Sequence, residues 1–414
     1  MSPAPSTRLR VFVAGEQETV PAATAHVSER RGVVSTTLTY DPTWTATPGA
    51  YALSPELALV QTRHQVSGPL PGAFADSAPD RWGRNLIAKR IRAQAPAGQQ
   101  GAPTIREVDY LLGVADETRQ GALRFAVDDA GPYLGTGSDV PRLVALPRLL
   151  RAADAVADPV ANSSADDLAA VKELLVAGSG SLGGARPKAS VHDGEQLLMA
   201  KFPHRSDAWD VMAWEKTTLD LARGCGIDVP RSELVGIGQR HVLLIERFDR
   251  RGTARIGYIS AMTLLQSSDG VPADYLEVAE ALAEHGGAVV ADLAQLWRRI
   301  AFMIVVNNVD DHLRNHGFLH SPSGWTLSPA FDLNPDPDPG AARVTTVGFV
   351  DDAEGALEQL VAHARAFRLT PERAAVVLDE VLASTRTWRA AARGNGVGEG
   401  EIRRFAPALD RFHR

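Results

Sequence analysis

Cysteine is almost absent from this sequence: Cys225 is the only one among 414 residues. A single thiol excludes a disulfide framework and any zinc site built from several cysteines. It fits a reducing compartment. Because Cys225 stands between Gly224 and Gly226, we interpret it as a small buried apolar residue rather than a reactive thiol.

Long apolar runs and an excess of positive charge are also missing. No stretch reaches the roughly 20 apolar residues of a membrane helix, and the N-terminal residues lack the apolar core of a signal peptide. We therefore expect a soluble cytoplasmic protein with no membrane segment. A net charge of −7 argues against a protein that binds nucleic acid on its own.

The apolar content is high enough for a large core, because 44% of the residues are hydrophobic. The first third alternates apolar and polar residues, as in RLRVFVAG and VVSTTLTY, which predicts strands. A helix is expected in APDRWGRNLIAKRIRAQ. The pattern predicts three parts, which are a mainly-β N-terminal subdomain over residues 1–155, a small sheet lobe over 156–250, and a helical lobe over 251–414.

The small lobe has its own order of elements. The Gly-rich stretch GSGSLGGARP is followed by predicted strands in KASVHD and QLLMAKFP, and SELVGIG and HVLLIERF are two more. Between the pairs, an amphipathic helix is expected in DAWDVMAWEKTTLDLARG, with Ser206 as its N-cap. A sheet lobe followed by a helical lobe predicts an α+β fold.

The stretch NNVDDHLRNHGFL, residues 307–319, carries unusual polar chemistry directly after the apolar helix pattern IAFMIVV. Asp310 and Asn315 are five residues apart, the spacing of the base and the metal-binding Asn in the catalytic loop of protein kinases. Seventeen residues further on, Asp332 ends a short apolar run in SPAFDL. Together they offer a proton acceptor and two oxygen ligands for Mg²⁺.

Upstream residues supply further parts of an ATP site in kinase order. Lys201 lies in a predicted strand, where a buried ammonium needs phosphates or an acid as a partner. Glu215 lies fourteen residues later in the predicted helix and could orient that lysine. IERFD ends a strand before the helical lobe, as an adenine-binding hinge would.

Taken singly, each of these signals also has an ordinary structural explanation. The Gly-rich stretch is most often a turn, Lys201 an edge-strand lysine, and Glu215 a solvated helix residue. His312 and His316 have the spacing of a zinc pair, but no Glu follows and no third ligand is evident, so we do not predict zinc. It is the shared order of the signals that favours phosphoryl transfer.

At these motifs the chain resembles the HipA family of serine/threonine kinases, the toxins of HipA–HipB toxin–antitoxin modules. The resemblance is carried by SLGGARPKAS, LLMAKFP, LLIERFDR, NNVDDHLRNHGFL and LSPAFDL, and it extends to YALSPELAL and FADSAPDRWGRNLI near the N-terminus. It implies a HipA-like bilobal, protein-kinase-like fold with a mainly-β N-terminal subdomain and a mostly helical C-terminal lobe. It also implies ATP and Mg²⁺ as cofactors.

The resemblance further implies roles for individual residues. Asp310 would be the catalytic base, Asn315 and Asp332 the Mg²⁺ ligands, and Ser181 an autophosphorylated loop serine whose phosphate silences the enzyme. The residues implied to bind ATP are Gly183, Gly184, Ala185, Arg186, Pro187, Lys188, Lys201, Glu246, Arg247, Phe248, His312, Arg314 and Asn315, with Glu215 as the acid that orients the lysine.

Partners are implied by the resemblance as well. They are a HipB-like helix-turn-helix antitoxin, DNA reached only through that antitoxin, and a protein substrate of translation such as an aminoacyl-tRNA synthetase. The chain departs from the family where Arg314 replaces a frequent lysine and where Pro187 removes a backbone donor. Two alternatives remain: a kinase-shaped co-repressor with little catalysis, and a small-molecule phosphotransferase with the same Asp–Asn–Asp logic.

Overall fold

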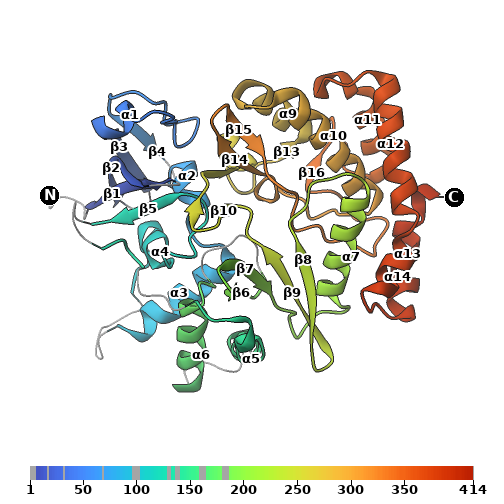
Figure 1. Cartoon of the computed structure of the whole chain (residues 1–414), viewed down its shortest axis with the longest axis horizontal. Helices are drawn as coiled ribbons and strands as arrows, with labels where there is room; N and C mark the ends of the chain where they lie inside the picture. Colours follow the sequence, from blue (N-terminus) through green and yellow to red (C-terminus); the bar gives the residue numbers. More distant parts are fainter. Residues whose placement is uncertain are drawn as a thin grey trace. The chain divides into compact units, whose positions relative to one another are not determined.

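The computed structural model separates the chain into two compact units (Figure 1). The first comprises Met1–Arg205 and Asp249–Ile259, and the second comprises Ser206–Phe248 and Ser260–Arg414. The structure describes residues 6–15, 18–30, 33–67, 70–95, 103–127, 132–135, 140–157, 165–179 and 186–413. The predicted division at residues 155 and 250 stays a prediction.

An antiparallel sheet forms the first part of the first unit, with strand order β4-β3-β2-β1-β5. Alternation of apolar and polar residues places Leu9 and Val11 of β1 and Leu38 of β3 in the core. The strands are β1 (Ser6–Ala14), β2 (Thr19–Arg30), β3 (Val33–Tyr40), β4 (His64–Ser67) and β5 (Leu123–Ala126). The sequence predicted β1 and β3 correctly.

The first unit has helices between and after the strands of this sheet. They are α1 (Pro42–Ala46), α2 (Gly72–Asp76), α3 (Arg81–Ala93), α4 (Glu107–Gly113), α5 (Leu146–Ala157) and α6 (Ala165–Val176). The helix predicted in APDRWGRNLIAKRIRAQ is α3. Asp80 caps it by accepting a hydrogen bond from the N–H of Gly83 at 2.7 Å.

Arg119 holds several of these segments together, although its side chain is fully buried. Its guanidinium donates to the carbonyl oxygens of Ser77, Leu111 and Val114 and lies over the ring of Phe125. Burial lowers the pKa of Arg119 to about 9. A buried cation is tolerated here because carbonyl oxygens replace the lost water.

A hairpin of β6 (Lys188–Asp193) and β7 (Gln196–Lys201) completes the main part of the first unit. The predicted strand KASVHD matches β6, and the predicted strand QLLMAKFP begins with β7 but extends two residues beyond its end at Lys201. The register pairs Lys188 with Lys201, so the first and last residues of the hairpin lie opposite each other. Both lysines are buried, with 1% and 5% of their surface exposed.

The short segment Asp249–Ile259 returns to the first unit after the chain has built part of the second. It contains β10 (Arg250–Arg251), β11 (Ala254–Arg255) and the start of β12 (Tyr258–Ser260). The Asp249 carboxylate accepts a hydrogen bond from the N–H of Gly121 at 2.8 Å. Arg250 donates to the carbonyl oxygens of Glu117 and Arg119, so the segment is held along 117–121.

The second unit begins with α7 (Val211–Gly224), followed by the hairpin of β8 (Ser232–Ile237) and β9 (Arg240–Glu246). The prediction of Ser206 as N-cap is wrong: Asp210 caps the helix and accepts from the N–H of Ala213 at 3.0 Å. Only a residue next to the first helical turn can reach these N–H groups. The residues from 206 to 209 precede the helix.

The rest of the second unit is mostly helical. Its helices are α8 (Ala261–Leu264), α9 (Tyr275–His285), α10 (Val289–Val305), α11 (Ala353–Ala362), α12 (Pro371–Thr385), α13 (Trp388–Gly394) and α14 (Glu399–Leu409). Its short strands are β13 (Ala273–Asp274), β14 (Gly317–Ser321), β15 (Gly324–Leu327) and β16 (Thr345–Thr346). The apolar α10 is buried over most of its length, as IAFMIVV predicted.

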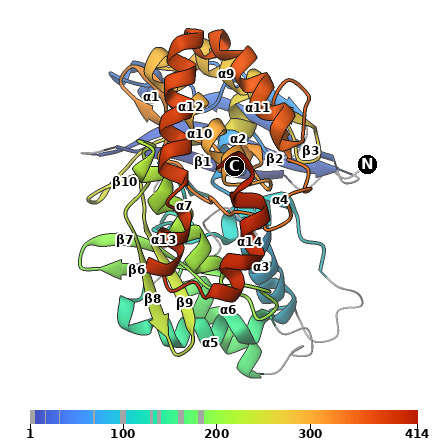
Figure 2. The same cartoon turned by 90° about the vertical axis from the view of Figure 1, so that its right-hand side faces the viewer.

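Aromatic rings join α7 to the C-terminal helices of the second unit (Figure 2). Trp214 stacks on Phe405 of α14 with ring centroids 3.9 Å apart, and it lies against Trp388 of α13. Its indole N–H donates to Glu401 at 2.9 Å. These contacts fix α7, and with it the fully buried Glu215 in the next position of the helix.

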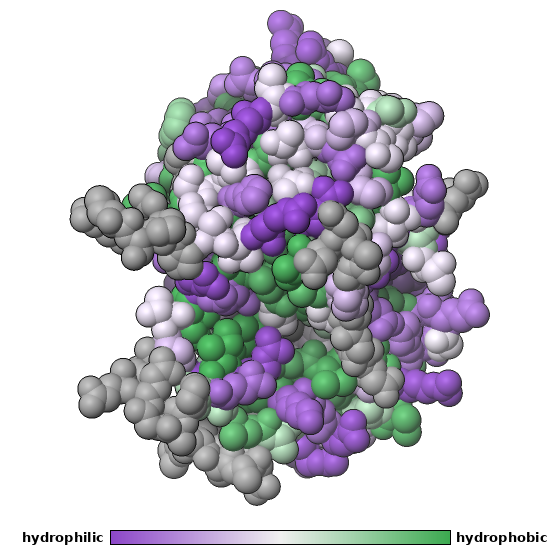
Figure 3. Space-filling model, turned by 90° about the vertical axis from the view of Figure 1, so that its left-hand side faces the viewer, coloured by the Kyte–Doolittle hydropathy of each residue, from purple (hydrophilic) through white to green (hydrophobic). Residues whose placement is uncertain are grey.

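Two observations concern the surface of the described residues. None of their helices is both long and apolar enough to span a bilayer. On the face in Figure 3, apolar side chains are interspersed with hydrophilic ones. Exposed Val residues such as Val33, Val127 and Val144 are ordinary single apolar side chains and indicate no docking surface.

Candidate active site

The polar stretch of residues 307–319 directly follows α10 in the second unit. The helix ends at Val305, and Asn307 takes a left-handed backbone conformation with φ +55°. Asn adopts this conformation more readily than most residues because its short amide can bond locally. Its Nδ2 donates to the carbonyl oxygens of Asp336 and Asp338, each at 2.9 Å, and this turns the chain out of the helix.

Asp310 and Asn315 are brought together by the loop that follows. The Asn315 amide Nδ2 donates to the carbonyl oxygen of Asp310 at 3.3 Å, and a 3-10 turn spans Leu313–Asn315. Asp310 is exposed as a residue although its carboxyl group is partly desolvated, whereas Asn315 is buried with 8% of its surface exposed. Because Nδ2 is used inside the loop, Oδ1 of Asn315 is the end of the carboxamide suited to a cation.

Asp332 lies near this loop, as the electrostatics of Asp310 indicate. Partial burial raises the pKa of Asp310, His312 opposes that shift, and the negative charge of Asp332 raises the pKa further. Asp332 itself has φ +58°, a left-handed conformation that Asp tolerates, and its carboxylate accepts from Nδ2 of Asn334 at 3.2 Å. Backbone strain of this kind is common at functional sites.

The neighbouring Asp311 points into the protein and fixes the loop from behind. Its carboxylate accepts hydrogen bonds from Nε2 of His316 at 2.8 Å and from the Tyr275 hydroxyl. Burial would raise the pKa of Asp311, but the charge and hydrogen bond of His316 and the Tyr275 hydrogen bond outweigh it, so the pKa is lowered. The carbonyl oxygen of Asp311 also accepts from the Thr345 hydroxyl.

Sequence reasoning identified Asp310 but did not identify the network around Asp311. Arg343 donates to the carbonyl oxygen of Asn308 at 2.7 Å, and Val344 N–H donates to that of Val309 at 2.9 Å. The segment 343–345 therefore runs along the loop. The available signal was the acidic pair at 310 and 311 after an apolar helix, but the partners of Asp311 are too distant in sequence to be predicted.

The two histidines and the arginine of this loop take part in different interactions. His316 is committed to Asp311, and the described residues contain no group of three or more His, Cys, Asp or Glu side chains arranged to hold a metal. Arg314 forms an exposed ion pair with Asp269 at 3.1 Å. His312 is partly buried and precedes the 3-10 turn.

The predicted hinge residues end β9 and contact the Asp332 region. Glu246 is the last residue of β9, and the buried Arg247 follows it. The Phe248 ring packs on the ring of Phe331, with centroids 5.4 Å apart. Since Phe331 directly precedes Asp332, the predicted hinge and the predicted metal ligand lie close together.

The lysine and the acid predicted to pair with it lie in different units. Lys201 is the last residue of β7 in the first unit, and Glu215 is fully buried in α7 of the second. Their pairing stays a prediction. Residues 180–185, with Ser181, Gly183, Gly184 and Ala185, lie outside the described residues.

Both ends of that loop are fixed within the first unit. Gly178, with φ +66°, lies just after α6, and a Cβ there would lie 2.3 Å from the Thr118 hydroxyl oxygen, so only glycine fits. At the other end, after Arg186 and Pro187, the buried Lys188 forms an ion pair with Asp80, the N-cap of α3. The predicted phosphate loop is therefore anchored on the N-terminal subdomain.

Comparison with known protein families matches both halves of the chain. The model of the HipA-like C-terminal domain matches residues 180–388, and that of the HipA N-terminal domain matches residues 20–124. The chain belongs to the HipA family. No curated protein matches it in sequence.

Solved structures confirm the predicted fold class. A chain in the structure of the Shewanella oneidensis MR-1 toxin–antitoxin system, with HipA, HipB and operator DNA, matches with a TM-score of 0.64. The identity is 17%, and the match covers 97% of this chain and 95% of that chain. The proinflammatory kinase CtkA of Helicobacter pylori matches at 15% identity over 52% of this chain and 93% of its own, with a TM-score of 0.36 that is too low to argue from. The fold is α+β and HipA-like, with the bilobal kinase-like architecture.

Proposed function

We propose that this chain is an ATP-dependent serine/threonine protein kinase of the HipA type and the toxin of a toxin–antitoxin module. One observation carries the proposal: the loop hydrogen bond from Asn315 to Asp310 lies within the electrostatic reach of Asp332. A proton acceptor next to two oxygen ligands is the arrangement that phosphoryl transfer needs. Membership of the HipA family supports the same activity.

In this proposal each residue of the second unit has a distinct chemical role. Asp310, exposed at the surface of the loop, accepts the proton of the attacking hydroxyl group. Asn315 and Asp332 would hold Mg²⁺ through oxygen atoms, and such an ion neutralises charge on the transferred phosphoryl group. One carboxylate and one carboxamide suit Mg²⁺, which commonly takes its remaining ligands from water and substrate phosphates.

The remaining assignments follow the family pattern. Lys201 would hold the ATP phosphates and Glu215 would orient it, while Glu246, Arg247 and Phe248 would face the adenine. The loop from Gly183 to Lys188 would cover the phosphates, with Lys188 closing it because Asp80 already engages its ammonium group. His312 and Arg314 would complete the phosphate surroundings.

Ser181 is the proposed autophosphorylation site. The nearest described serines on either side, Ser179 and Ser190, are fully buried, which favours a serine between them. A phosphate with a charge of about −1.5 to −2 could not share the pocket with triphosphate, so the modification would silence the enzyme. Peptide mass spectrometry of the purified protein, with Ser181→Ala as control, tests this assignment.

The partners are proposed on the same basis. A HipB-like helix-turn-helix antitoxin fits the likeness to a chain solved with HipB and operator DNA. With its net charge of −7, this chain would reach DNA only through that basic partner. The protein substrate would belong to translation, such as an aminoacyl-tRNA synthetase.

The test of the kinase activity is incubation with labelled ATP and Mg²⁺, without added substrate. We expect the wild type to label itself and Asp310→Asn to lose labelling while binding ATP within a few-fold of the wild type. Asp193→Asn, a change at the exposed last residue of β6, is the matched control. Loss of ATP binding together with activity in Asp310→Asn would contradict its role as base, and no labelling by the wild type would favour a co-repressor.

Growth of the host tests the toxin assignment separately. Induction of the wild type without an antitoxin should arrest bacterial growth, and induction of Asp310→Asn should not. Equal arrest by both proteins would show that toxicity does not depend on phosphoryl transfer.

A further inference from the structure

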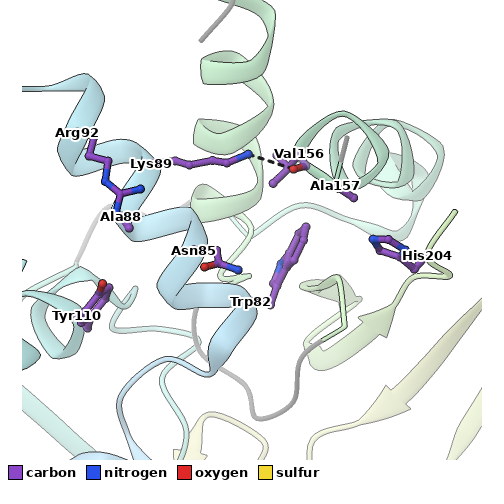
Figure 4. A pocket seen from close by; sticks show the side chains of 9 residues that line it. All are labelled: Trp82, Asn85, Ala88, Lys89, Arg92, Tyr110, Val156, Ala157 and His204. Carbon is purple, nitrogen blue, oxygen red and sulfur yellow. Dashed lines mark hydrogen bonds between the residues drawn. The ribbon is translucent and has the colours of Figure 1, made fainter. Parts of the chain in front are cut away.

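A cavity and an exposed aromatic ring are formed by residues other than those assigned to phosphoryl transfer. The cavity, of about 390 Å³, lies beside α3 in the first unit, and in it Lys89 donates to the carbonyl oxygen of Val156 at 3.1 Å (Figure 4). The ring is that of Phe349 in the second unit. Hydrogen bonds of its own segment connect Phe349 to the loop that carries Asp310.

Phe349 lies at the tip of a two-residue turn between β16 and α11, which are both labelled in Figure 1. Across the turn, Val347 and Val350 exchange two backbone hydrogen bonds of 3.2 Å each. The central residues Gly348 and Phe349 have φ values of +59° and +65°, and a type I′ turn requires positive φ at both positions. Glycine adopts this conformation freely, but for a bulky residue such as Phe it is an outlier.

The buried carboxylate of Asp274 holds this turn in place. Its Oδ2 accepts hydrogen bonds from the N–H of Phe349 at 2.9 Å and from the Thr346 hydroxyl at 2.7 Å. Its Oδ1 accepts from the N–H of Leu276 at the start of α9. Because Asp274 is only 2% exposed, the backbone of the turn is anchored on the core of the second unit.

The ring of Phe349 adds little to folding, because 87% of the residue's surface is exposed. Apolar surface that stays in water contributes no burial free energy, and a left-handed backbone is unfavourable for a residue with a side chain. Asn or Gly would form the same turn with less strain. A single exposed apolar residue is ordinary, but one that also strains the backbone indicates a function outside folding.

The turn belongs to the segment that borders the catalytic loop. The N–H of Val344 donates to the carbonyl oxygen of Val309 at 2.9 Å. The Thr345 hydroxyl donates to the carbonyl oxygen of Asp311, on the other side of the proposed base. Phe349 follows Thr345 by four residues, which span at most about 14 Å. An extended substrate segment of a few residues covers the same distance from its acceptor hydroxyl.

The surroundings of the exposed ring carry negative charge. Asp351 and Asp352 follow the turn directly, and both are exposed. Residues 344–362 contain no Lys or Arg. Glu354 is paired with Arg411 at 3.3 Å, so the carboxylates next to the ring are the two aspartates. Such a surface is complementary to a peptide that has an apolar side chain and a cation close together.

We propose, on the basis of the kinase function proposed above, that Phe349 docks the protein substrate beside its acceptor serine or threonine. The ring covers an apolar side chain of the substrate, and Asp351 faces a Lys or Arg next to it. Contact with the substrate buries the apolar surface that folding leaves in water. The turn is fixed before contact, which lowers the entropy cost of binding. Phe349 touches no reacting atom and acts on the choice of substrate.

Thermal unfolding of the full-length protein tests whether the ring serves folding. Phe349→Asn should raise the melting temperature slightly, because Asn adopts positive φ more readily and no packing is lost. Val290→Asn is the matched control, since Val290 is another apolar residue of the second unit, 69% exposed in the first turn of α10. A lower melting temperature in Phe349→Asn than in the control would show that the ring packs in the folded protein and would overturn the proposal.

Arrays of serine peptides, with one flanking position at a time fixed as each amino acid, test the docking itself. Bound protein is measured without ATP, and phosphate incorporation is measured with labelled ATP and Mg²⁺. The wild type should prefer an apolar residue over Asp at one flanking position by about tenfold, with a weaker preference for Lys or Arg beside it. Phe349→Asn should lose the first preference and Asp351→Asn the second, whereas Val290→Asn should keep both.

The proposal is overturned if the wild type shows no apolar preference at any flanking position, or if Phe349→Asn keeps that preference. Sedimentation tests a second copy of the chain as the occupant: a wild-type dimer that Phe349→Asn dissociates would assign the ring to that contact instead. Failure of the kinase function is recognised separately, because the wild type would then label neither itself nor any peptide. The binding preference measured without ATP still decides the role of Phe349 in that case.

Discussion

Nε2 of His316 and Oδ2 of Asp311 are hydrogen-bonded in the interior of the second unit, 2.8 Å apart. Both residues are about 97% buried. The pair spans the 3-10 turn between Asp310 and Asn315. The pair therefore closes the turn that carries the two residues to which we assign proton transfer and Mg²⁺ binding.

Removing the carboxylate of Asp311 should be strongly destabilising. Asp311→Ala leaves His316 and the Tyr275 hydroxyl buried without an acceptor, and we expect a loss of about 3–5 kcal/mol in the free energy of unfolding. Tyr275→Phe removes one hydrogen-bond donor only, so we expect the free energy of unfolding to fall by about 1 kcal/mol. Urea unfolding at neutral pH measures both. Similar small losses in the two variants would mean that the pair contributes little to stability.

The buried lysine at the end of the phosphate loop allows a double-mutant test. Asp80→Asn preserves the cap of α3, since Asn is also a good N-cap, but leaves the Lys188 ammonium buried without its counter-charge. We expect the free energy of unfolding of Asp80→Asn to be lower than that of the wild type by about 3–5 kcal/mol. Adding Lys188→Met should restore much of the lost stability, because the buried ammonium group that the Asp80 carboxylate balanced is then absent. Additive losses in the double variant would show that the two side chains do not interact.

Acid should destabilise the protein through His320. Burial lowers the pKa of His320 to about 4, from an ordinary value of 6.5. Between pH 6.5 and 4 the unfolded chain binds a proton that the folded chain does not, so this residue contributes a loss of stability as the pH falls through that window. The pH dependence of the melting temperature should be flatter in His320→Gln.

An exposed histidine provides the control for that experiment. His26 lies in β2 with its side chain exposed, so His26→Gln should leave the pH profile of the wild type unchanged. If the His320→Gln profile runs parallel to the wild type between pH 6.5 and 4, burial of His320 is not the cause.

Asp332→Asn should weaken the binding of Mg²⁺–ATP by at least about tenfold, equivalent to about 1.4 kcal/mol. Asn keeps the size of the side chain and tolerates the left-handed backbone at this position, so the change isolates the negative charge. Asp338→Asn is the matched control on the same segment, because Asp338 is exposed. Unchanged affinity in Asp332→Asn, measured by calorimetry, would remove Asp332 from the metal site.

The elements that sequence patterns predicted well are those determined by local periodicity. β6 has its predicted bounds and β7 begins where predicted and ends two residues earlier, and the two strands pair with each other as one local hairpin. Burial of Cys225, 3% exposed, agrees with its place between two glycines after α7, and burial raises the pKa of its thiol. The N-cap of α7 was misplaced because several polar residues precede the helix and only geometry selects Asp210.

Contacts between residues distant in sequence account for what the patterns missed. Asp249 and Gly121 are 128 residues apart, and no periodicity connects them. The residues around Asp311 come from α9, the loop and β16 for the same reason. Candidate residues such as Asp310 and Asn315 could be named because their spacing lies within one short motif, whereas the side chains that hold the motif come from elsewhere.

The return of residues 249–259 to the first unit has a practical consequence for fragment design. A gene truncated after Arg205 would encode the N-terminal sheet and the β6–β7 hairpin but not Asp249, Arg250 or Arg255. Arg255 shares the Asp116 carboxylate with Arg124, so that truncation would leave part of this charge cluster without its partner. A stable fragment would need residues 249–259 appended through a linker, and its expression in soluble form would depend on them.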